Sequence, residues 1–215
     1  MLTRSRHVAL LLFDEVEVLD FAGAVQILTL AGRHWNWRPF KIHAVAETPG
    51  LISTCNQLRI EAPTPLSACP APEIVILPGG YGAVRASRNA TITSWLTSVL
   101  PQAQLCCTIG NGAMLLSAAG RHGSEWVSVT QSTAHLLSEA GSSLMANTVE
   151  RLVVGQQVIS TRSCEGSVDL GLQIVERMLG ASLRKKVQSE LMLAGEPPPV
   201  DVTALPDDAT GTSRS

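Results

Sequence analysis

The amino-acid sequence predicts an α/β protein with a single domain, built as a three-layer α/β/α sandwich around a mostly parallel sheet. Two observations lead to this prediction. Apolar runs of strand length alternate along the chain with segments whose apolar residues recur at helical spacing, which is typical of a parallel sheet covered by helices on both faces. Several of these runs are continuously apolar, as in strands buried on both faces. No linker interrupts the pattern before residue 200.

The predicted domain spans residues 5–200. Its strands are expected where short runs are apolar or alternate between apolar and polar residues: 7–13, 40–46, 73–77, 105–109, 126–129, 151–154 and 158–161. Residues 51–53 and 58–60 are expected to form a short hairpin. Residues 201–215 are polar and rich in proline, glycine, serine and aspartate, so we expect a flexible C-terminal tail there.

Helices are expected between these strands, at 19–28, 92–100, 112–120, 133–140, 168–179 and 183–193. The clearest signal is the spacing of Val168, Leu172, Val175 and Leu179, which puts all four on one helical face. The prolines at 197–199 are expected to end the last helix. Residues 62–72 are rich in proline and are expected to form turns.

The bulk composition excludes several classes of function. The chain has 215 residues, of which 45% are hydrophobic and 16% charged, and its net charge of −2 comes without any basic block. Nucleic acid and membranes are therefore not expected as partners, and no run approaches the ~18 apolar residues of a membrane span. The odd number of cysteines, five, favours a reducing cytoplasm over a disulfide framework. No metal-ligand spacing is present, and no cofactor is implied.

The sequence around residue 110 is typical of a strand, a tight turn and a helix. The apolar run Leu105–Ile109 leads into Gly110-Asn111-Gly112, and a run of small and apolar residues follows. Many α/β enzymes present their nucleophile on such a strand-to-helix turn, the nucleophile elbow. The residue at the tip of this turn is Gly110, which has no side chain.

A second glycine-rich turn follows the strand expected at 73–77. Gly79 and Gly80 allow a backbone to approach a ligand closely and leave N–H groups able to point at it, so we expect them to line a pocket. The other interpretation is an ordinary turn that ends the strand. Tyr81 follows, either covering the pocket or lying on the surface.

The chain resembles the ThiJ/PfpI superfamily, whose flavodoxin-like sandwich is shared with class I glutamine amidotransferases. The resemblance covers residues 8–199 and rests on five stretches in the right order: 19–23, 74–80, 110–120, 160–170 and 196–199. It is nearest to the isonitrile hydratase-like branch, which also supplies the N-terminal sensor domain of some AraC-type regulators. The resemblance implies a small-molecule substrate or ligand and a homodimer.

The family's motifs place its functional positions on this chain. Its elbow reads Cys-Thr-Gly-Ala or Cys-Asn-Gly-Ala before a helix that ends Ala-Ala-Gly, and counting back from Ala118-Ala119-Gly120 puts the catalytic cysteine position on Gly110. The family's acidic partner falls on Asp20, and its oxyanion donors fall on the backbone N–H groups of Gly80 and Asn111. Two alternatives stay open: Cys107 could be the nucleophile in another register, and Asp20 could be a helix N-cap.

The chain departs from the family at four places around the implied pocket. Gly110 replaces the cysteine, and Ala24 replaces a proline. Gln131, beside Thr130, stands where the family has a histidine. The small-residue segment becomes Thr161–Gly166, which brings in Arg162 and Glu165. We expect Thr130, Gln131, Arg162 and Glu165 near the substrate, with a surface ion pair as the other interpretation for the last two. The five histidines of the chain are expected to be structural or solvated.

Three functions are compatible with this pattern. In the isonitrile hydratase-like branch a cysteine thiolate attacks the isonitrile carbon, and water then releases a formamide; without a thiol at Gly110 that covalent route is closed. Asp20 could then activate water for direct hydration or hydrolysis. Alternatively, the chain is a non-catalytic small-molecule sensor, or an inactivated variant of a cysteine-dependent hydratase or amidase.

Overall fold

A computed structural model describes residues 4–34, 38–120 and 125–191. Its centre is a seven-stranded sheet with the order β10-β11-β7-β6-β1-β2-β5. All neighbouring strands are parallel except β10, which runs antiparallel to β11 at one edge. The strands are β1 (Arg6–Leu11), β2 (Phe40–Ala46), β5 (Thr64–Pro65), β6 (Ile74–Leu77), β7 (Leu105–Ile109), β10 (Leu152–Val154) and β11 (Val158–Thr161). The predicted mostly parallel sheet is confirmed.

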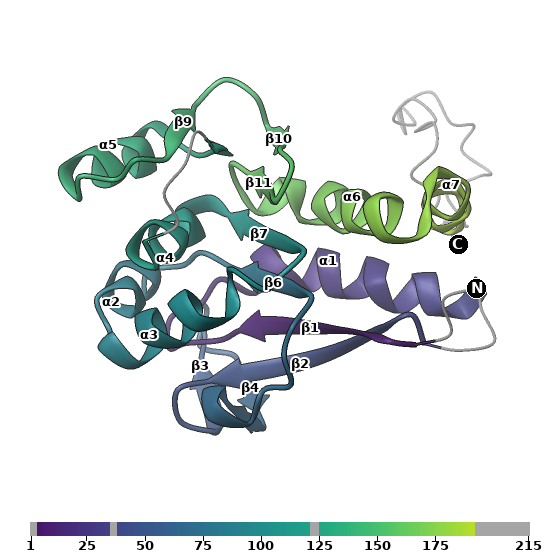
Figure 1. Ribbon diagram of the computed structural model, residues 1–215, viewed down its shortest axis with the longest axis horizontal. Coiled ribbons are helices and arrows are strands. Elements are labelled where there is room, and N and C mark those ends of the chain that lie inside the picture. Colours follow the sequence, from purple (N-terminus) through teal and green to yellow (C-terminus); the bar gives the residue numbers. More distant parts are fainter. Residues whose placement is uncertain (1–3, 35–37, 121–124, 192–215) are drawn as a thin grey trace, which may run out of the picture.

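Helices lie on both sides of the sheet (Figure 1). The chain leaves β1 toward β2 in one direction and leaves β6 toward β7 in the other, so right-handed crossovers place the connecting helices on opposite faces. One group comprises α1 (Val18–Ala31), α6 (Ser167–Leu179) and α7 (Ala181–Glu190), which contact each other. The other comprises α2 (Ala83–Ser87), α3 (Ala90–Val99) and α4 (Ala113–Ala118). This is the predicted α/β/α sandwich.

Two small sheets stand apart from the main one. The predicted hairpin is present as β3 (Gly50–Ser53) and β4 (Arg59–Ala62). Between α4 and β10 the chain forms a parallel pair, β8 (Trp126–Ser128) and β9 (Met145–Asn147), with α5 (Gln131–Glu139) beside it (Figure 1). Sequence patterns did not predict β5, β9 or α2. Each is only two to five residues long, too short to show a periodicity.

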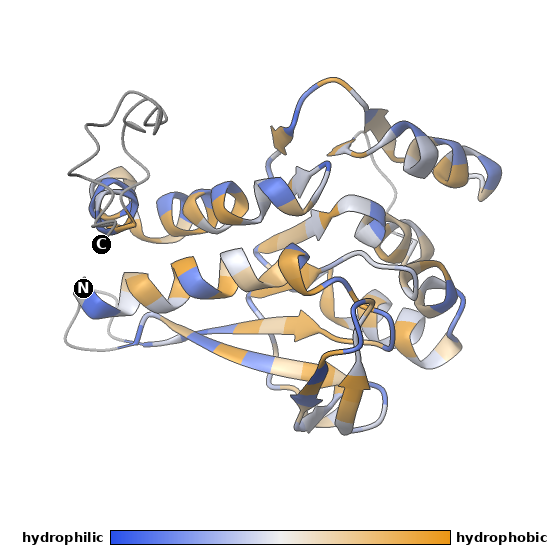
Figure 2. Ribbon diagram, turned by 180° about the vertical axis from the view of Figure 1, so that it is seen from behind, coloured by the Kyte–Doolittle hydropathy of each residue, from blue (hydrophilic) through white to orange (hydrophobic). Residues whose placement is uncertain are grey.

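The core lies along the central strands. Every residue of β6, β7 and β11 is buried, which explains their continuously apolar or small side chains. Figure 2 shows the hydrophobic colour concentrated in the strands and on the sheet-facing sides of the helices. No helix within the described ranges is long and apolar enough to cross a membrane. The predicted tail at 201–215, and the end expected for the last helix near 193, lie outside the described residues.

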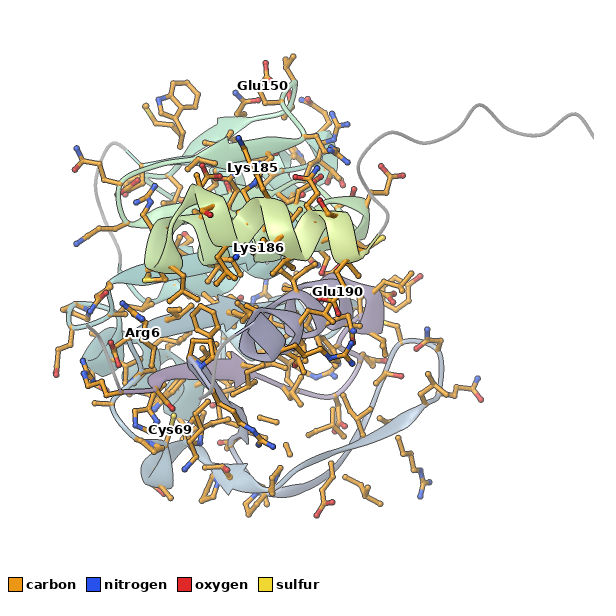
Figure 3. All side chains as sticks on the ribbon, turned by 90° about the vertical axis from the view of Figure 1, so that its right-hand side faces the viewer. Arg6, Cys69, Glu150, Lys185, Lys186 and Glu190 are labelled. Carbon is orange, nitrogen blue, oxygen red and sulfur yellow. The ribbon has the colours of Figure 1, made fainter. Side chains whose placement is uncertain are left out.

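Helices α1 and α6 run side by side in close contact because glycines face the interface. A Cβ on Gly23 would lie 3.0 Å from Ser167 Oγ, and a Cβ on Gly171 would lie 2.8 Å from Ile27 Cβ. Helix α7 covers the far end of this pair and carries Lys185, Lys186 and Glu190, which Figure 3 labels. The close contact fixes which residues of α6 and the turn before it meet the first turn of α1.

The topology predicts where a ligand binds. The strand order reverses direction between β1 and β6, and in open α/β sheets ligands bind outside the carboxyl ends of the strands at such a switch point. The residues that follow β1, β6 and β7 all lie at that edge. They include the start of α1, the Gly79-Gly80 turn and the elbow at Gly110.

Candidate active site

The elbow has the predicted geometry. Strand β7 ends at Ile109, the 3-10 turn η3 (Gly110–Gly112) follows, and α4 begins at Ala113. Gly110 has a φ of +53°, in the left-handed region that favours glycine. Gly112 is needed for another reason, since a Cβ there would lie 2.1 Å from the carbonyl oxygen of Leu77. The second glycine therefore allows the elbow to pack directly on β6.

The space above Gly110 is open. A Cβ at this position would have only two atoms within 4 Å apart from its chain neighbours: the carbonyl oxygen of Arg162 at 3.7 Å and Oδ2 of Asp20 at 3.9 Å. A side chain on residue 110 would thus project between a buried carboxylate and the end of β11. This space would hold a side chain on residue 110, although the φ of +53° would strain the backbone of any residue other than glycine.

Cys107 lies in a different environment. It is fully buried in β7, and burial raises the pKa of its thiol well above the ordinary value. A reactive cysteine needs access to its substrate and a stabilised thiolate. The alternative register, with Cys107 as nucleophile, therefore has no support from the geometry.

Asp20 lies in the first turn of α1 and is 5% exposed. Its Oδ2 accepts a hydrogen bond of 2.7 Å from the backbone N–H of Gly79. Burial raises the pKa of this carboxyl from 3.8 to about 6, the Gly79 N–H opposes the rise, and the charge of Glu17 adds to it. The N-cap of α1 is Glu17, whose side chain accepts from the N–H of Leu19. The N-cap alternative for Asp20 was therefore wrong.

Asn111 joins the two turns. Its side-chain oxygen accepts from the N–H of Gly80 at 2.9 Å, and its side-chain nitrogen donates to the carbonyl of Gly80 at 2.9 Å. Gly79 lies between the side chains of Asn111 and Asp20, since a Cβ on Gly79 would be 2.4 Å from Asn111 Oδ1 and 2.7 Å from Asp20 Oδ2. The N–H of Gly80, expected to serve as an oxyanion donor, is thus already bonded to the side chain that follows the elbow.

Arg162 and Glu165 take different positions from those expected. The guanidinium of Arg162 donates to the carbonyls of Thr148 and Val149 at 3.2 and 3.3 Å, so it anchors the loop before β10, and only its backbone carbonyl faces Gly110. Glu165 is exposed. The two side chains form no ion pair with each other in the described part of the chain.

The remaining predicted residues lie at the periphery. Tyr81 is 81% exposed next to the glycine turn, and its N–H donates to Cys55 Sγ at 3.5 Å. Thr130 caps α5 by accepting from the N–H of Thr133, and Gln131 is exposed on the first residue of that helix. Within the ranges that the structure describes, neither Thr130 nor Gln131 hydrogen-bonds to the residues around the elbow.

Two residues that sequence reasoning did not select lie beside Asp20. The hydroxyl of Ser167 donates to the carbonyl of Asp20 at 2.8 Å and accepts from the N–H of Ala24 at 3.1 Å. Cys164 is close enough that the charge of Asp20 helps to raise the pKa of its thiol, after burial as the main cause. The signal available in the sequence was the position of Cys164 just before a helix with a strong apolar face.

A separate cavity of about 1000 Å³ lies between the C-terminal ends of α3 and α4 and the β10–β11 turn. Its walls include Thr97, Trp126, Val154 and Gln156, and Glu125 is the one titratable residue among its described lining. None of the elbow residues lines it. In the described ranges, no group of three or more His, Cys, Asp or Glu side chains is placed to hold a metal ion.

The class of protein is defined by its α/β sandwich, in which a strand–turn–helix elbow, a buried acid and a glycine turn meet at the carboxyl edge of a mostly parallel sheet. A sequence model of the DJ-1/PfpI family matches residues 6–177, and the chain belongs to this family.

Individual relatives are distant. An isonitrile hydratase of Pseudomonas putida is 21% identical over 192 residues, which cover 89% of this chain and 80% of that protein. A ThiJ/PfpI family protein from Pseudomonas syringae has a similar structure, with a TM-score of 0.78 and 18% identity over 91% of this chain and 78% of its own. An AraC family transcriptional regulator from Pseudomonas putida matches with a TM-score of 0.75 and 18% identity, over 86% of this chain and 99% of its own.

Proposed function

We propose that this chain acts on a small molecule at the elbow in an isonitrile hydratase-like reaction, and that Asp20 supplies the chemistry by activating water in place of a cysteine thiolate. The observation that carries the proposal is the position of the Asp20 carboxylate, which is buried and lies 3.9 Å from the point where a side chain on Gly110 would begin. A water molecule in the open space above Gly110 would be within reach of this base.

The protonation state of Asp20 suits a general base. With a pKa of about 6, the carboxylate is ionised at neutral pH yet basic enough to accept a proton from water. As it does so, the water oxygen bonds to the isonitrile carbon. The proton held by Asp20 then passes to that carbon, which gives a formimidic acid, and transfer of its hydroxyl proton to the nitrogen gives the formamide. Water and isonitrile are the only reactants, and no oxidant or reductant is needed.

The surrounding backbone would orient this reaction. The Gly79 N–H holds Asp20 Oδ2 in place, and the carbonyl of Arg162 bounds the other side of the space. We propose the N–H of Asn111 as a donor to charge that develops on the substrate. The N–H of Gly80 can join it only by exchanging its bond with the Asn111 side chain for one with substrate. Tyr81 lies at the edge of the site. We also propose that the protein is a homodimer and works in the cytoplasm.

A second candidate is a sensor domain that binds a small molecule without turning it over. Two observations favour it: no side chain occupies the tip of the elbow, and the fold is similar to that of an AraC family regulator. A third candidate is an inactivated variant in which Gly110 replaced a cysteine, since the open space there would accept a cysteine Cβ in ordinary contact.

An assay of three proteins against isonitriles, simple amides and glyoxals separates these candidates. The proposal predicts turnover by the chain as given and its loss in Asp20→Asn. Turnover that appears only in Gly110→Cys would support the inactivated variant instead. A chain that turns over nothing in any form, but retains a small molecule through purification, would support the sensor.

A further inference from the structure

Asp20 is bonded to a different segment at each of its ends. Its side-chain Oδ2 accepts from the backbone N–H of Gly79 at 2.7 Å, and its backbone carbonyl accepts from the hydroxyl of Ser167 at 2.8 Å. Gly79 belongs to the turn after β6, and Ser167 is the first residue of α6. Asp20 therefore links two segments that are far apart in the sequence, and its place beside the elbow depends on both.

The Ser167 hydroxyl binds two groups that an α-helix normally joins to each other. It donates to the carbonyl of Asp20 and accepts from the N–H of Ala24 at 3.1 Å. These are the carbonyl of one residue and the N–H of the residue four positions later, the two ends of one helical hydrogen bond. One side chain of α6 thus spans a complete turn of α1, and this turn carries the buried carboxylate.

Gly23 makes room for this contact. A Cβ on Gly23 would lie 3.0 Å from Ser167 Oγ and 3.0 Å from Val168 Cγ2. Glycine inside a helix also leaves the backbone of its turn less restrained than alanine would. The first turn of α1 has few hydrogen bonds of its own, because the first four N–H groups of a helix lack partners within it. The contact with α6 supplies a restraint that the local sequence does not.

The contact is shielded from water. Ser167 is 1% exposed and Asp20 is 5% exposed. Water cannot easily replace the hydroxyl at a buried position, and an unpaired polar group there is costly, so both bonds favour one arrangement of the two helices. Burial is also the largest cause of the raised pKa of Asp20. A change that lets water reach this turn is therefore expected to lower the pKa of the carboxyl.

We propose that Ser167 is a positioning residue for Asp20, and that its hydroxyl, through the Asp20 backbone, holds the carboxylate beside Gly79 and the open space at Gly110. The effect on turnover rests on the proposed function, whereas the effect on the carboxylate does not. Ser167 acts through Asp20 and takes no part in making or breaking bonds to substrate. Catalytic groups must be held within about 0.5 Å of their productive geometry, so a loosened first turn lowers the rate while the base is still present.

Titration of Asp20 tests the proposal without a substrate. NMR of the carboxyl carbon, assigned by its absence in Asp20→Asn, gives the pKa in the native chain, in Ser167→Ala and in Gly171→Ala. Gly171→Ala is the matched control, since its Cβ would lie 2.8 Å from Ile27 Cβ and would disturb the same two helices farther from Asp20. The proposal predicts that the pKa falls from about 6 toward 3.8 in Ser167→Ala and stays near 6 in Gly171→Ala.

The outcomes separate this proposal from the proposed function. A pKa that stays near 6 in Ser167→Ala would overturn the positioning role, and so would an equal fall in Gly171→Ala, because the effect would then belong to helix packing in general. A native chain that hydrates no isonitrile would overturn the proposed function and leave the titration result standing. In a chain that does, kcat should fall roughly tenfold or more in Ser167→Ala with KM nearly unchanged. An unchanged kcat would overturn the role of Ser167 in the reaction.

Discussion

The side chain of Asn111 and the backbone of Gly80 bond to each other twice, with both hydrogen bonds 2.9 Å long. This pair links the elbow after β7 to the glycine turn after β6. The turn also forms an isolated antiparallel bridge with Val16, just before α1. The three segments that meet around Asp20 are therefore held together by backbone and amide contacts, and the geometry of the site does not depend on a side chain at residue 110.

Replacing Asn111 with alanine removes both bonds. The N–H and carbonyl of Gly80 are partly buried, so we expect a loss of about 1–3 kcal/mol in the free energy of unfolding. Chemical denaturation measures it. Asn111→Asp is the matched control, because it keeps an acceptor for the Gly80 N–H but loses the donor. Its free energy of unfolding should lie between those of the native chain and Asn111→Ala. Equal stability of all three proteins would show that the pair does not hold the turns.

The two glycines of the elbow should respond differently to alanine. Gly110→Ala meets open space but must adopt a φ of +53°, which costs about 1–2 kcal/mol. Gly112→Ala places a Cβ 2.1 Å from the Leu77 carbonyl and forces the elbow away from β6, so we expect a larger loss, of roughly 3 kcal/mol or more. Thermal unfolding of both variants tests this order. A smaller effect at Gly112 would contradict the close approach of elbow and strand.

Gly110→Cys should be tolerated and should gain thiol chemistry. Its Cβ would lie 3.9 Å from Asp20 Oδ2, with the same backbone cost as Gly110→Ala. We expect the two variants to unfold at similar temperatures and only the cysteine variant to react with iodoacetamide at residue 110, as peptide mapping would show. An unreactive cysteine at residue 110 would mean that the space above the elbow is closed to reagents.

Asp20 should make stability depend on pH in a defined direction. Its pKa is about 6 in the folded chain, against 3.8 as the ordinary value. Between these values the unfolded chain releases the proton first, so folding stability falls as pH rises from about 4 to 6 and the loss stays constant above. A pKa difference of about two corresponds to roughly 3 kcal/mol. Asp20→Asn should therefore be more stable than the native chain at pH 7.5, and little different at pH 4. A pH-independent difference would show that folding does not raise the pKa of Asp20.

Local patterns in the sequence predicted much of the fold. The bounds of β2 and β7 coincide with the predicted runs, because a continuous or alternating apolar stretch is read directly from neighbouring residues. The elbow was predicted for the same reason, since Gly110 and Gly112 stand between a strand and a helix. The mostly parallel sheet, with helices on both faces, followed from the alternation of strands and helices along the chain.

The contacts of the site depend on distant parts of the chain, and these were not predictable. The place of Cys164 beside Asp20 depends on the register between α1 and α6, which no local pattern encodes. The bond between Asn111 and Gly80 depends on a side-chain rotamer. Arg162 turns to the loop at 148–149 because the carbonyls there accept its hydrogen bonds. The prediction that Arg162 lies near the substrate rested only on its charge and its position in the motif.

In the proposed reaction, Asp20 acts as the base at this elbow. The most direct test is the pH dependence of kcat/KM for isonitrile hydration by the native chain and by Asp20→Asn. We predict a rate that rises with pH through about 6, as Asp20 ionises, and that falls by at least a hundredfold in the variant. A variant that keeps the native rate and the same pH profile would exclude Asp20 as the base.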